Sequence, residues 1–182
     1  MAAARRENRG PNAAAGNRRA LLAAAVEVFS EQGFSAPLSA VAKRAGVGQG
    51  SLYRHFPDRV SLALAVFADN VAELEALAER PDTTLDRMLA RITDQTIASI
   101  AFVEIITPVT SDVRLGQVTQ RMRMVVAKML DRAVRAGTVR PTLRAEDVLL
   151  AIGMVAALLA KTPSTDRRTT ADAAWELLLR AF

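Results

Sequence analysis

A short helix, a glycine turn and a second short helix are predicted for residues 37–55, and this pattern constrains the fold more than any other. The apolar positions of the first helix recur at helical spacing: Leu38, Val41, Ala42 and Ala45. Gly46 supplies the left-handed residue that ends this helix. After the turn, Val47 and Leu52 point back toward a core, and the outward positions are Gln49, Gly50, Ser51, Tyr53, Arg54 and His55. A helix-turn-helix places such a second helix in the major groove of DNA, so these outward residues are the candidate DNA-binding set.

The excess positive charge of the chain lies near its N-terminus. Residues 1–59 hold nine Lys and Arg against four Asp and Glu, and the rest of the chain holds fifteen of each, so the whole net charge of +5 belongs to the first part. Neutralised phosphates supply most of the non-specific affinity of a protein for DNA. A solvated surface with a disordered basic tail explains the charge alone equally well. Its combination with the helix-turn-helix pattern favours DNA.

The composition argues against several other functions. The chain has no apolar run of about 18 residues that could span a membrane, and its first residues lack the apolar core of a secretory signal. Cysteine is absent and His55 is the only histidine, so we expect no metal site, no catalytic triad and no cofactor. We find no glycine-rich phosphate loop either. The sequence therefore predicts a cytoplasmic protein that is not an enzyme.

Helical periodicity extends over almost the whole chain, and no strand alternation of useful length is present. The predicted fold class is therefore all-α, with about nine helices. We expect a disordered basic tail at residues 1–16, a helix-turn-helix domain at residues 17–57, and a helical regulatory and dimerisation domain at residues 58–182. The expected helices cover about residues 17–32, 37–45, 49–55, 58–80, 83–100, 115–136, 141–160 and 166–182, with a bend or short helix near Thr107, Pro108 and Ser111.

Capping residues mark several of these helix ends. Asn17, Asp58 and Thr83 are the expected N-caps, and Asp86 completes a capping box with Thr83. A glycine follows the helix of residues 115–136 and is expected to end it.

The segment of residues 148–160 is apolar all round and must be covered on both sides. A second copy of the chain is the economical cover, because this helix and the last one would then form a four-helix interface with their symmetry mates. The alternative is a monomer in which both helices simply complete a bundle. The candidate dimer residues are Leu150, Met154, Ala157, Leu158, Ala171, Trp175, Leu178 and Phe182.

Polar residues on apolar helix faces indicate a ligand pocket in the second domain, because binding sites are mostly apolar with few polar groups. Flexible methionines would fill in around them. The candidate lining residues are Met88, Ile92, Gln95, Thr96, Glu104, Met122, Val126, Met129 and Met154. A methionine-rich core with ordinary polar residues at its edge is the alternative.

Three segments resemble, in order and spacing, the N-terminal region of TetR-type transcriptional regulators. They are AVEVFSEQGF, LSAVAKRAGV and GSLYRHFPDR, and the similar stretch runs from Arg18 to about Leu77. The resemblance implies a three-helix DNA-binding domain and a long fourth helix that joins it to a ligand-binding and dimerising domain. It also implies a dimer bundle formed by the last two helices.

The resemblance implies roles for several basic residues. Arg59 stands where the family commonly has a phosphate-binding lysine. Three further arginines would flank the duplex: Arg18, Arg19 and Arg44. Phosphate contacts of this kind position a protein on DNA without reading its sequence.

Gln49 and Arg54 are the candidates for base contacts, because amide and guanidinium groups bond purine edges bidentately. The residues alone leave a second interpretation of Tyr53, that of a half-buried core ring. Pro37 and Gly48 depart from the family pattern, which often has Thr or Ser at both positions. An N-cap or a phosphate contact is therefore missing at each.

These observations predict a homodimeric DNA-binding regulator, a repressor released by a small apolar or amphipathic effector. Its operator would be double-stranded DNA with an inverted repeat, since two reading heads are related by symmetry. The alternative is a ligand-binding or scaffold protein whose basic end meets an anionic membrane. That function needs an exposed apolar helix face, whereas the apolar face of residues 17–33 is expected to pack inside the fold.

Overall fold

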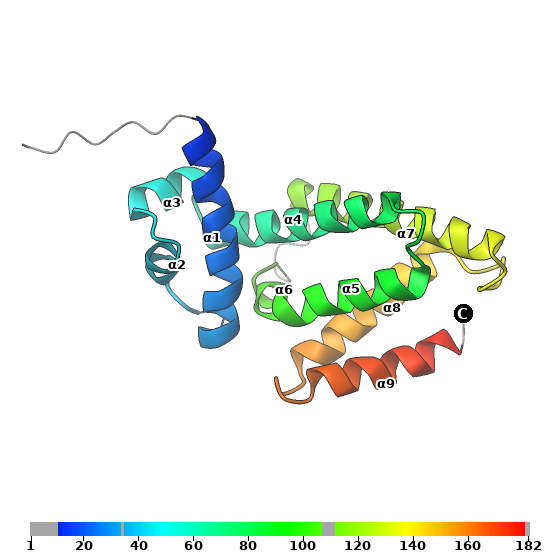
Figure 1. Ribbon diagram of the computed structural model, residues 1–182. Coiled ribbons are helices and arrows are strands. Elements are labelled where there is room, and N and C mark those ends of the chain that lie inside the picture. The colour runs from blue at the N-terminus through cyan, green and yellow to red at the C-terminus, as the bar shows by residue number, and fades with distance from the viewer. Residues whose placement is uncertain (1–10, 34, 107–111, 181–182) are drawn as a thin grey trace, which may run out of the picture.

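Helices make up all the regular secondary structure in the described residues, which are 11–33, 35–106 and 112–180, apart from the side chains of 11, 12 and 104–106. In this computed structural model (Figure 1) the described chain forms nine helices, which confirms the all-α fold class. Their bounds are α1 Pro11–Gln32, α2 Leu38–Arg44, α3 Gln49–His55, α4 Arg59–Glu79, α5 Leu85–Ala98, α6 Ile100–Ile106, α7 Val113–Arg135, α8 Ala145–Ala160 and α9 Arg167–Leu179. The bend predicted at Thr107, Pro108 and Ser111 lies outside the described residues.

The helices surround two hydrophobic cores that share α4. Figure 1 shows α1, α2 and α3 gathered at one end, with α4 running from them into the remaining helices. The first core joins these three helices to the beginning of α4 and to Phe102 of α6. The second core takes in the end of α4 together with α5, α7, α8 and α9. We call the part around the first core the head.

Helix α7 holds α4 in place along its length. The guanidinium of Arg121 donates to both carboxylate oxygens of Glu75, at 2.8 and 2.7 Å. Near the C-terminal end of α4, Arg132 donates to the backbone carbonyls of Arg80, Thr83 and Ala78, at 2.9, 3.0 and 3.1 Å. Since the last carbonyls of a helix have no partner within it, Arg132 supplies the donors that this end of α4 lacks.

Two predicted glycine stops have the expected conformation. Gly46 has φ 65° and Gly137 has φ 69°. At the first, Gly46 N–H donates to the carbonyl of Lys43 and Val47 N–H donates to that of Ala42, at 3.1 and 3.0 Å. This is the Schellman pattern, which satisfies the carbonyls of the last helical turn and reverses the chain.

Helix starts were predicted less well than helix stops. The Asp58 cap is confirmed, because its Oδ1 accepts from the Ser61 N–H at 2.6 Å. The start at Asn17 is wrong: α1 begins at Pro11, so residues 11–16 are helical rather than part of a tail. Proline at the first helical position loses no hydrogen bond, and the alanines that follow favour helix.

The N-cap of α5 is Thr84, not the predicted Thr83. The Thr84 hydroxyl oxygen accepts from the Arg87 N–H at 3.2 Å. Thr83 is buried, and its hydroxyl donates to the carbonyl of Leu77 at 2.8 Å. A tertiary contact to the end of α4 has therefore displaced the cap by one residue.

Trp175 and Ala171, predicted at a dimer interface, lie in the core of their own chain. Trp175 is 8% exposed and Ala171 is fully buried, because α9 turns this face toward α5 and α8. The Trp175 indole N–H donates to the Thr93 hydroxyl oxygen at 2.8 Å, and that hydroxyl donates to the carbonyl of Leu89. The prediction for these two residues is wrong, since the apolar face of α9 has a partner inside the chain.

We expect Thr93→Val to lower the free energy of unfolding by about 1–3 kcal/mol, because it leaves the buried indole N–H of Trp175 without an acceptor. Thr96→Val is the matched control, since the Thr96 hydroxyl donates to the carbonyl of Ile92 in the same way but accepts no hydrogen bond from the described residues. Urea denaturation followed by tryptophan fluorescence measures both. Equal losses in the two variants would contradict the role given to the Trp175–Thr93 bond.

Candidate functional site

Helix α3 presents a polar face that two buried side chains hold in place. Leu52 and Phe56 are buried in the core of the head, at 1% and 2% exposure. The opposite side of α3 is open: Gln49, Gly50, Tyr53 and Arg54 are exposed, while Ser51 and His55 are half-buried. Tyr53 is 51% exposed and does not belong to the core of the head, which favours its outward interpretation. The structure therefore brings the predicted α3 residues together on one helix at the surface.

Helices α2 and α3 both begin without a side-chain cap, as expected from the residues that stand at their starts in place of Thr or Ser. Pro37 and Gly48 are the two N-cap residues, and neither makes a side-chain cap hydrogen bond. Both short helices are held instead by their packing on α1, through buried residues such as Val41 and Leu52. The position of α3 therefore depends on the core of the head rather than on its own capping.

Two arginines lie over buried aromatic rings at the base of α3. The guanidinium carbon of Arg18 is 5.7 Å from the centroid of the Phe56 ring. That of Arg59 is 5.4 Å from the centroid of the Phe29 ring. Such cation–π contacts fix where a positive charge stands. Arg19, which was predicted to flank the duplex together with Arg18 and Arg44, is exposed on α1.

Arg44 links α2 to α1. Its guanidinium donates to Glu27 at 2.9 Å and to Glu31 at 3.1 and 2.7 Å. The hydrogen bond from Arg44 lowers the pKa of the Glu31 carboxyl below its ordinary value. Two carboxylates therefore already accompany the charge of Arg44, and its predicted place beside a duplex stays a prediction.

An apolar cavity of about 230 Å³ lies between α4, α5, α7 and α8. Four predicted lining residues border it: Ile92, Gln95, Thr96 and Met122. The sequence analysis missed other lining residues, among them Phe67, Asn70, Ser99, Val118 and Ile152. Asn70 and Ser99 carried a signal that could have found them, since each is a polar residue within an apolar helical stretch. For the apolar residues, no sequence signal separates a cavity wall from a filled core.

The remaining pocket predictions are wrong or untested. Met88, Val126 and Met129 are fully buried in the second core and do not border the cavity. Met154 is 53% exposed on the outer side of α8, away from the cavity lining. The side chain of Glu104 lies outside the described residues.

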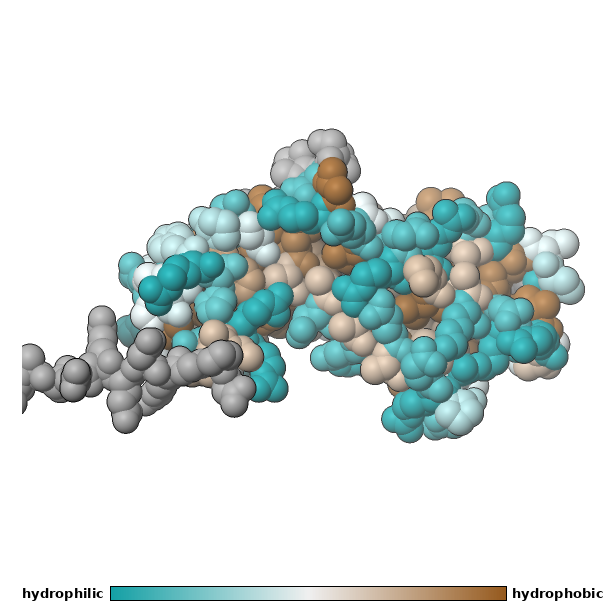
Figure 2. Space-filling model, turned by 90° about the horizontal axis from the view of Figure 1, so that it is seen from above, coloured by the Kyte–Doolittle hydropathy of each residue, from teal (hydrophilic) through white to brown (hydrophobic). Residues whose placement is uncertain are grey.

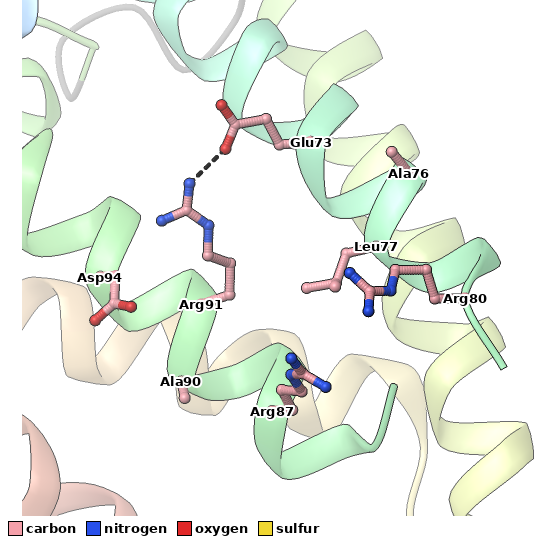
Figure 3. A pocket seen from close by; sticks show the side chains of 8 residues that line it. All are labelled: Glu73, Ala76, Leu77, Arg80, Arg87, Ala90, Arg91 and Asp94. Atoms are coloured by element: carbon pink, nitrogen blue, oxygen red, sulfur yellow. Dashed lines mark hydrogen bonds and ion pairs between the residues drawn. The ribbon is translucent and has the colours of Figure 1, made fainter. Parts of the chain in front are cut away.

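A second, larger hollow of about 510 Å³ lies between α4 and α5, and Figure 3 shows its charged lining. Arg91 reaches across it to Glu73, with nitrogen and oxygen 2.5 Å apart. Arg80 and Arg87 each pair with Asp82 at 3.3 Å, and Asp94 pairs with Arg168. Because these charges neutralise one another in an open groove, the apolar cavity is the better candidate for a ligand site.

An apolar stripe is exposed on α8. It consists of Leu150, Met154, Ala157 and Leu158, all of which were predicted for a dimer interface. Leu177 of α9 is 68% exposed and was missed, whereas the predicted Leu178 is partly buried against the second core. The two residues are neighbours in a run of three leucines, so only the rotation of α9 decides which one faces outward. Phe182 lies outside the described residues.

Other kinds of site find little support on the described part of the chain. None of its helices combines the length and hydropathy that a bilayer crossing requires. No group of three His, Cys, Asp or Glu side chains within residues 11–33, 35–106 and 112–180 could hold a metal ion. The face shown in Figure 2 is mostly hydrophilic, with apolar residues in separate patches.

Two protein families match the chain. Residues 21–66 match the family described as bacterial regulatory proteins, tetR family. Residues 80–180, more than half of the chain, match the C-terminal domain of SbtR-like transcriptional regulators. No curated protein matches it.

Solved structures with the same fold cover almost the whole chain. A TetR transcriptional regulator from Streptomyces coelicolor is 31% identical, with a TM-score of 0.67, over 90% of this chain and 97% of that one. FadR from Bacillus subtilis, in complex with stearoyl-CoA, is 18% identical, with a TM-score of 0.61 over 90% and 98%. LfrR from Mycobacterium smegmatis, in complex with proflavine, is 22% identical, with a TM-score of 0.60 over 93% and 98%.

The Asp58 cap that joins the head to α4 makes a pH-dependent contribution to stability. Hydrogen bonding to the Ser61 N–H lowers the pKa of Asp58 from its ordinary value of 3.8. A carboxyl whose pKa is lower in the folded state stabilises the protein above its unfolded pKa and loses this contribution as pH falls through the folded value. Asp58→Ala should therefore cost about 1 kcal/mol near pH 7, and the difference from wild type should shrink below about pH 4.

Asp58→Ser is the matched control, because a serine hydroxyl can cap the helix without titrating. Its difference in stability from wild type should be small near pH 7 and should move in its favour as Asp58 becomes protonated. Urea denaturation at a series of pH values measures all three proteins. A cost of Asp58→Ala that stays constant down to about pH 2 would show that the carboxylate is not the stabilising group.

Proposed function

The chain belongs to the TetR family of bacterial transcription regulators, which bind DNA and carry a ligand-binding C-terminal domain, and from this premise we propose that it is a cytoplasmic homodimeric repressor released by a small apolar or amphipathic effector. One observation carries the proposal. Helix α3 turns its polar side outward while Leu52 and Phe56 anchor it from below. An exposed helix fixed in this manner can enter a major groove without rearranging the head.

Each outward residue of α3 has a role in this proposal. Gln49 and Arg54 contact base edges, because their amide and guanidinium groups match purine donor and acceptor patterns. The phosphate backbone of the DNA accepts hydrogen bonds from Tyr53, Ser51 and His55. Gly50, which has no side chain, lets the DNA backbone approach α3 closely. Around them Arg18, Arg19, Arg44 and Arg59 contribute positive charge, with the first and last held over aromatic rings.

The predicted division at residue 57 is part of the proposal, with a modification. The prediction assigns residues 17–57 to the DNA-binding domain and residues 58–182 to the regulatory and dimerisation domain. Because α1 begins at Pro11, the first domain also includes residues 11–16. The beginning of α4 packs in the core of the head, through Leu62, Ala63 and Val66. Helix α4 therefore belongs mechanically to both domains.

A dimer would cover the exposed stripe on α8. Leu150 and Met154 are 65% and 53% exposed on one side of a helix whose other side packs in the core. Monomeric proteins seldom expose large side chains together in this way. A two-fold dimer through α8 and Leu177 of α9 would bury them and present two α3 helices to an inverted-repeat operator, with half-sites about 34–36 Å apart.

Release by the effector would pass from the cavity to the head through aromatic packing. Phe67 of α4 and Val103 of α6 border the cavity. Phe102, the residue before Val103, is buried in the head. The centroid of its ring lies 5.1 Å from that of Phe29 and 6.4 Å from that of Phe67. A ligand that displaces Phe67 or Val103 moves α4 and α6, so that the paired α3 helices no longer match successive major grooves. A coupling of about 1–3 kcal/mol suffices for regulation.

Structures of related fold are consistent with a bound effector. FadR is seen with stearoyl-CoA and LfrR with proflavine, and another structure of the same fold is described as a γ-butyrolactone receptor. The chemistry of these molecules differs widely, so they support the presence of an effector rather than its identity.

The membrane alternative finds no support in the head. A helix that lies on a bilayer needs its apolar face outside. In α1 that face is buried, with Leu21 and Ala25 fully inside and Val28 and Phe29 each at 1% exposure. Binding of duplex DNA is therefore preferred as the function of the basic end.

Tyr53→Ala and Arg54→Ala should each weaken binding to an operator selected from random duplexes by about 5- to 150-fold, or about 1–3 kcal/mol. Arg135→Ala is the control, an exposed arginine at the far end of α7. Fluorescence anisotropy measures the affinities at several salt concentrations. Wild-type affinity should fall steeply with salt, and a log–log slope near zero would contradict phosphate binding.

Met154→Glu should raise the dissociation constant of the dimer by at least about a hundredfold, because two-fold symmetry would bring two carboxylates together in an apolar contact. Met124→Glu on α7 is the matched control, since Met124 is 64% exposed but lies outside the stripe. Sedimentation equilibrium measures both variants. A Met154→Glu protein that dimerises as wild type does would remove α8 from the interface.

A further inference from the structure

We propose that the cavity between α4, α5, α7 and α8 binds a neutral alcohol, a mainly apolar molecule with one hydroxyl group that Asn70 and Ser99 hydrogen-bond. This inference rests on the proposed function, in which the same cavity holds the effector. Beyond that function, it specifies that the effector is uncharged and that its polar group is a hydroxyl.

The described cavity wall carries no charged side chain. Residues 104–111, whose side chains the structure does not describe, contain no Lys or Arg in the sequence and one acidic residue, Glu104. An anionic ligand would therefore be buried without a counter-charge, which costs several-fold more than the burial of a neutral polar group. Carboxylates and phosphates are excluded by this argument.

Among the described residues, Glu73 is the carboxylate linked to the cavity wall, and its direction disfavours a cation. This carboxylate accepts from the Gln95 amide at 3.1 Å, which links it to the cavity wall. Figure 3 shows it turned toward Arg91 in the outer groove, where its side chain is 53% exposed. Because Arg91 already neutralises it, Glu73 offers little to a cation inside the cavity.

Most polar residues of the wall satisfy their donors within the protein. The Thr96 hydroxyl donates to the carbonyl of Ile92 at 2.8 Å, and the Thr119 hydroxyl donates to that of Leu115 at 2.9 Å. The Gln95 amide donates to the carbonyl of Asn70 and to Glu73. Of the described wall side chains, Asn70 and Ser99 keep both donors and acceptors for a ligand, and Gln95 keeps only its Oε1 acceptor.

Asn70 and Ser99 keep donors and acceptors that no described residue uses. The Asn70 Nδ2 donates to the Ser99 Oγ at 3.3 Å, and Ser99 is 3% exposed. Within the described residues, the Ser99 hydroxyl hydrogen has no acceptor and the Asn70 Oδ1 accepts no hydrogen bond. If the Asn70 amide is rotated by a half turn, the Ser99 hydroxyl donates to the Asn70 Oδ1 instead. The unused groups are then the Asn70 Nδ2 donors and the Ser99 Oγ acceptor, so a donor again lies beside an acceptor. A ligand hydroxyl both donates and accepts, so it satisfies the pair with a single oxygen.

The size of the cavity selects small molecules. A volume of about 230 Å³ equals roughly eight water molecules at about 30 Å³ each. This admits a ligand on the order of ten non-hydrogen atoms. Octanol has this size and chemistry, and octanoate and octylammonium match its chain length with opposite charges.

Isothermal titration of the full-length protein with octanol, octanoate and octylamine at about pH 7 tests the ligand class, because the last two are ionised there. We expect octanol to bind at least about tenfold more tightly than either ion. Octanoate or octylammonium that binds as tightly as octanol would overturn the inference, while the cavity would remain the effector site of the proposed function.

The variants Ser99→Ala and Asn70→Leu test the polar pair. Each should weaken octanol binding by about tenfold, because the hydroxyl then loses a partner in a buried site. Thr119→Val is the matched control, a wall residue whose hydroxyl is already used by Leu115. Circular dichroism verifies that each variant is folded. An equal loss in Thr119→Val would remove Asn70 and Ser99 from the recognition of the hydroxyl.

The two levels of the proposal fail in distinguishable ways. If octanol binds as expected but leaves operator affinity unchanged, release by this effector class fails and the ligand chemistry stands. If none of the three probes binds, both the alcohol assignment and the cavity as an effector site are overturned. Loss of operator binding in the Tyr53 and Arg54 variants would still support the DNA-binding part of the proposed function.

Discussion

The ring of Phe102 is the contact through which the two halves of the molecule depend on each other. It belongs to α6, within the regulatory part of the chain, yet it is fully buried in the head between Phe29 and Phe67. Closely packed interiors transmit displacement instead of absorbing it. Phe67 and Val103 form part of the cavity wall. A displacement of either side chain would therefore be transmitted to the core that supports α3.

The elements that could be predicted from sequence are those with local causes. Gly46 and Gly137 end helices through their own backbone conformation, and Asp58 begins one through its own side chain. The caps predicted at Asn17 and Thr83 failed because other forces acted there. Alanines before Asn17 extend α1, and the buried Thr83 hydroxyl is held by the carbonyl of Leu77.

The two candidate sites differ in how far the sequence could specify them. On α3, two inward side chains determine which residues are outward, so the polar face followed from spacing alone. In the second domain, periodicity identifies Ile92 and Met88 as inward residues without distinguishing them. Met88 packs against other side chains in the second core, whereas Ile92 borders the cavity. That difference depends on how four helices fit together, which no single helix encodes.

A cavity left among four helices costs stability, because its walls lose packing contacts that a filled core would have. Larger side chains on the wall would fill the space. Ala156 is one wall position in α8 where a larger side chain is compatible with the helical backbone. This cost is offset when a matching molecule enters, because it restores the packing, and Asn70 and Ser99 can hydrogen-bond it. The same features that weaken the empty protein thus provide the free energy with which a ligand can shift α4 and α6.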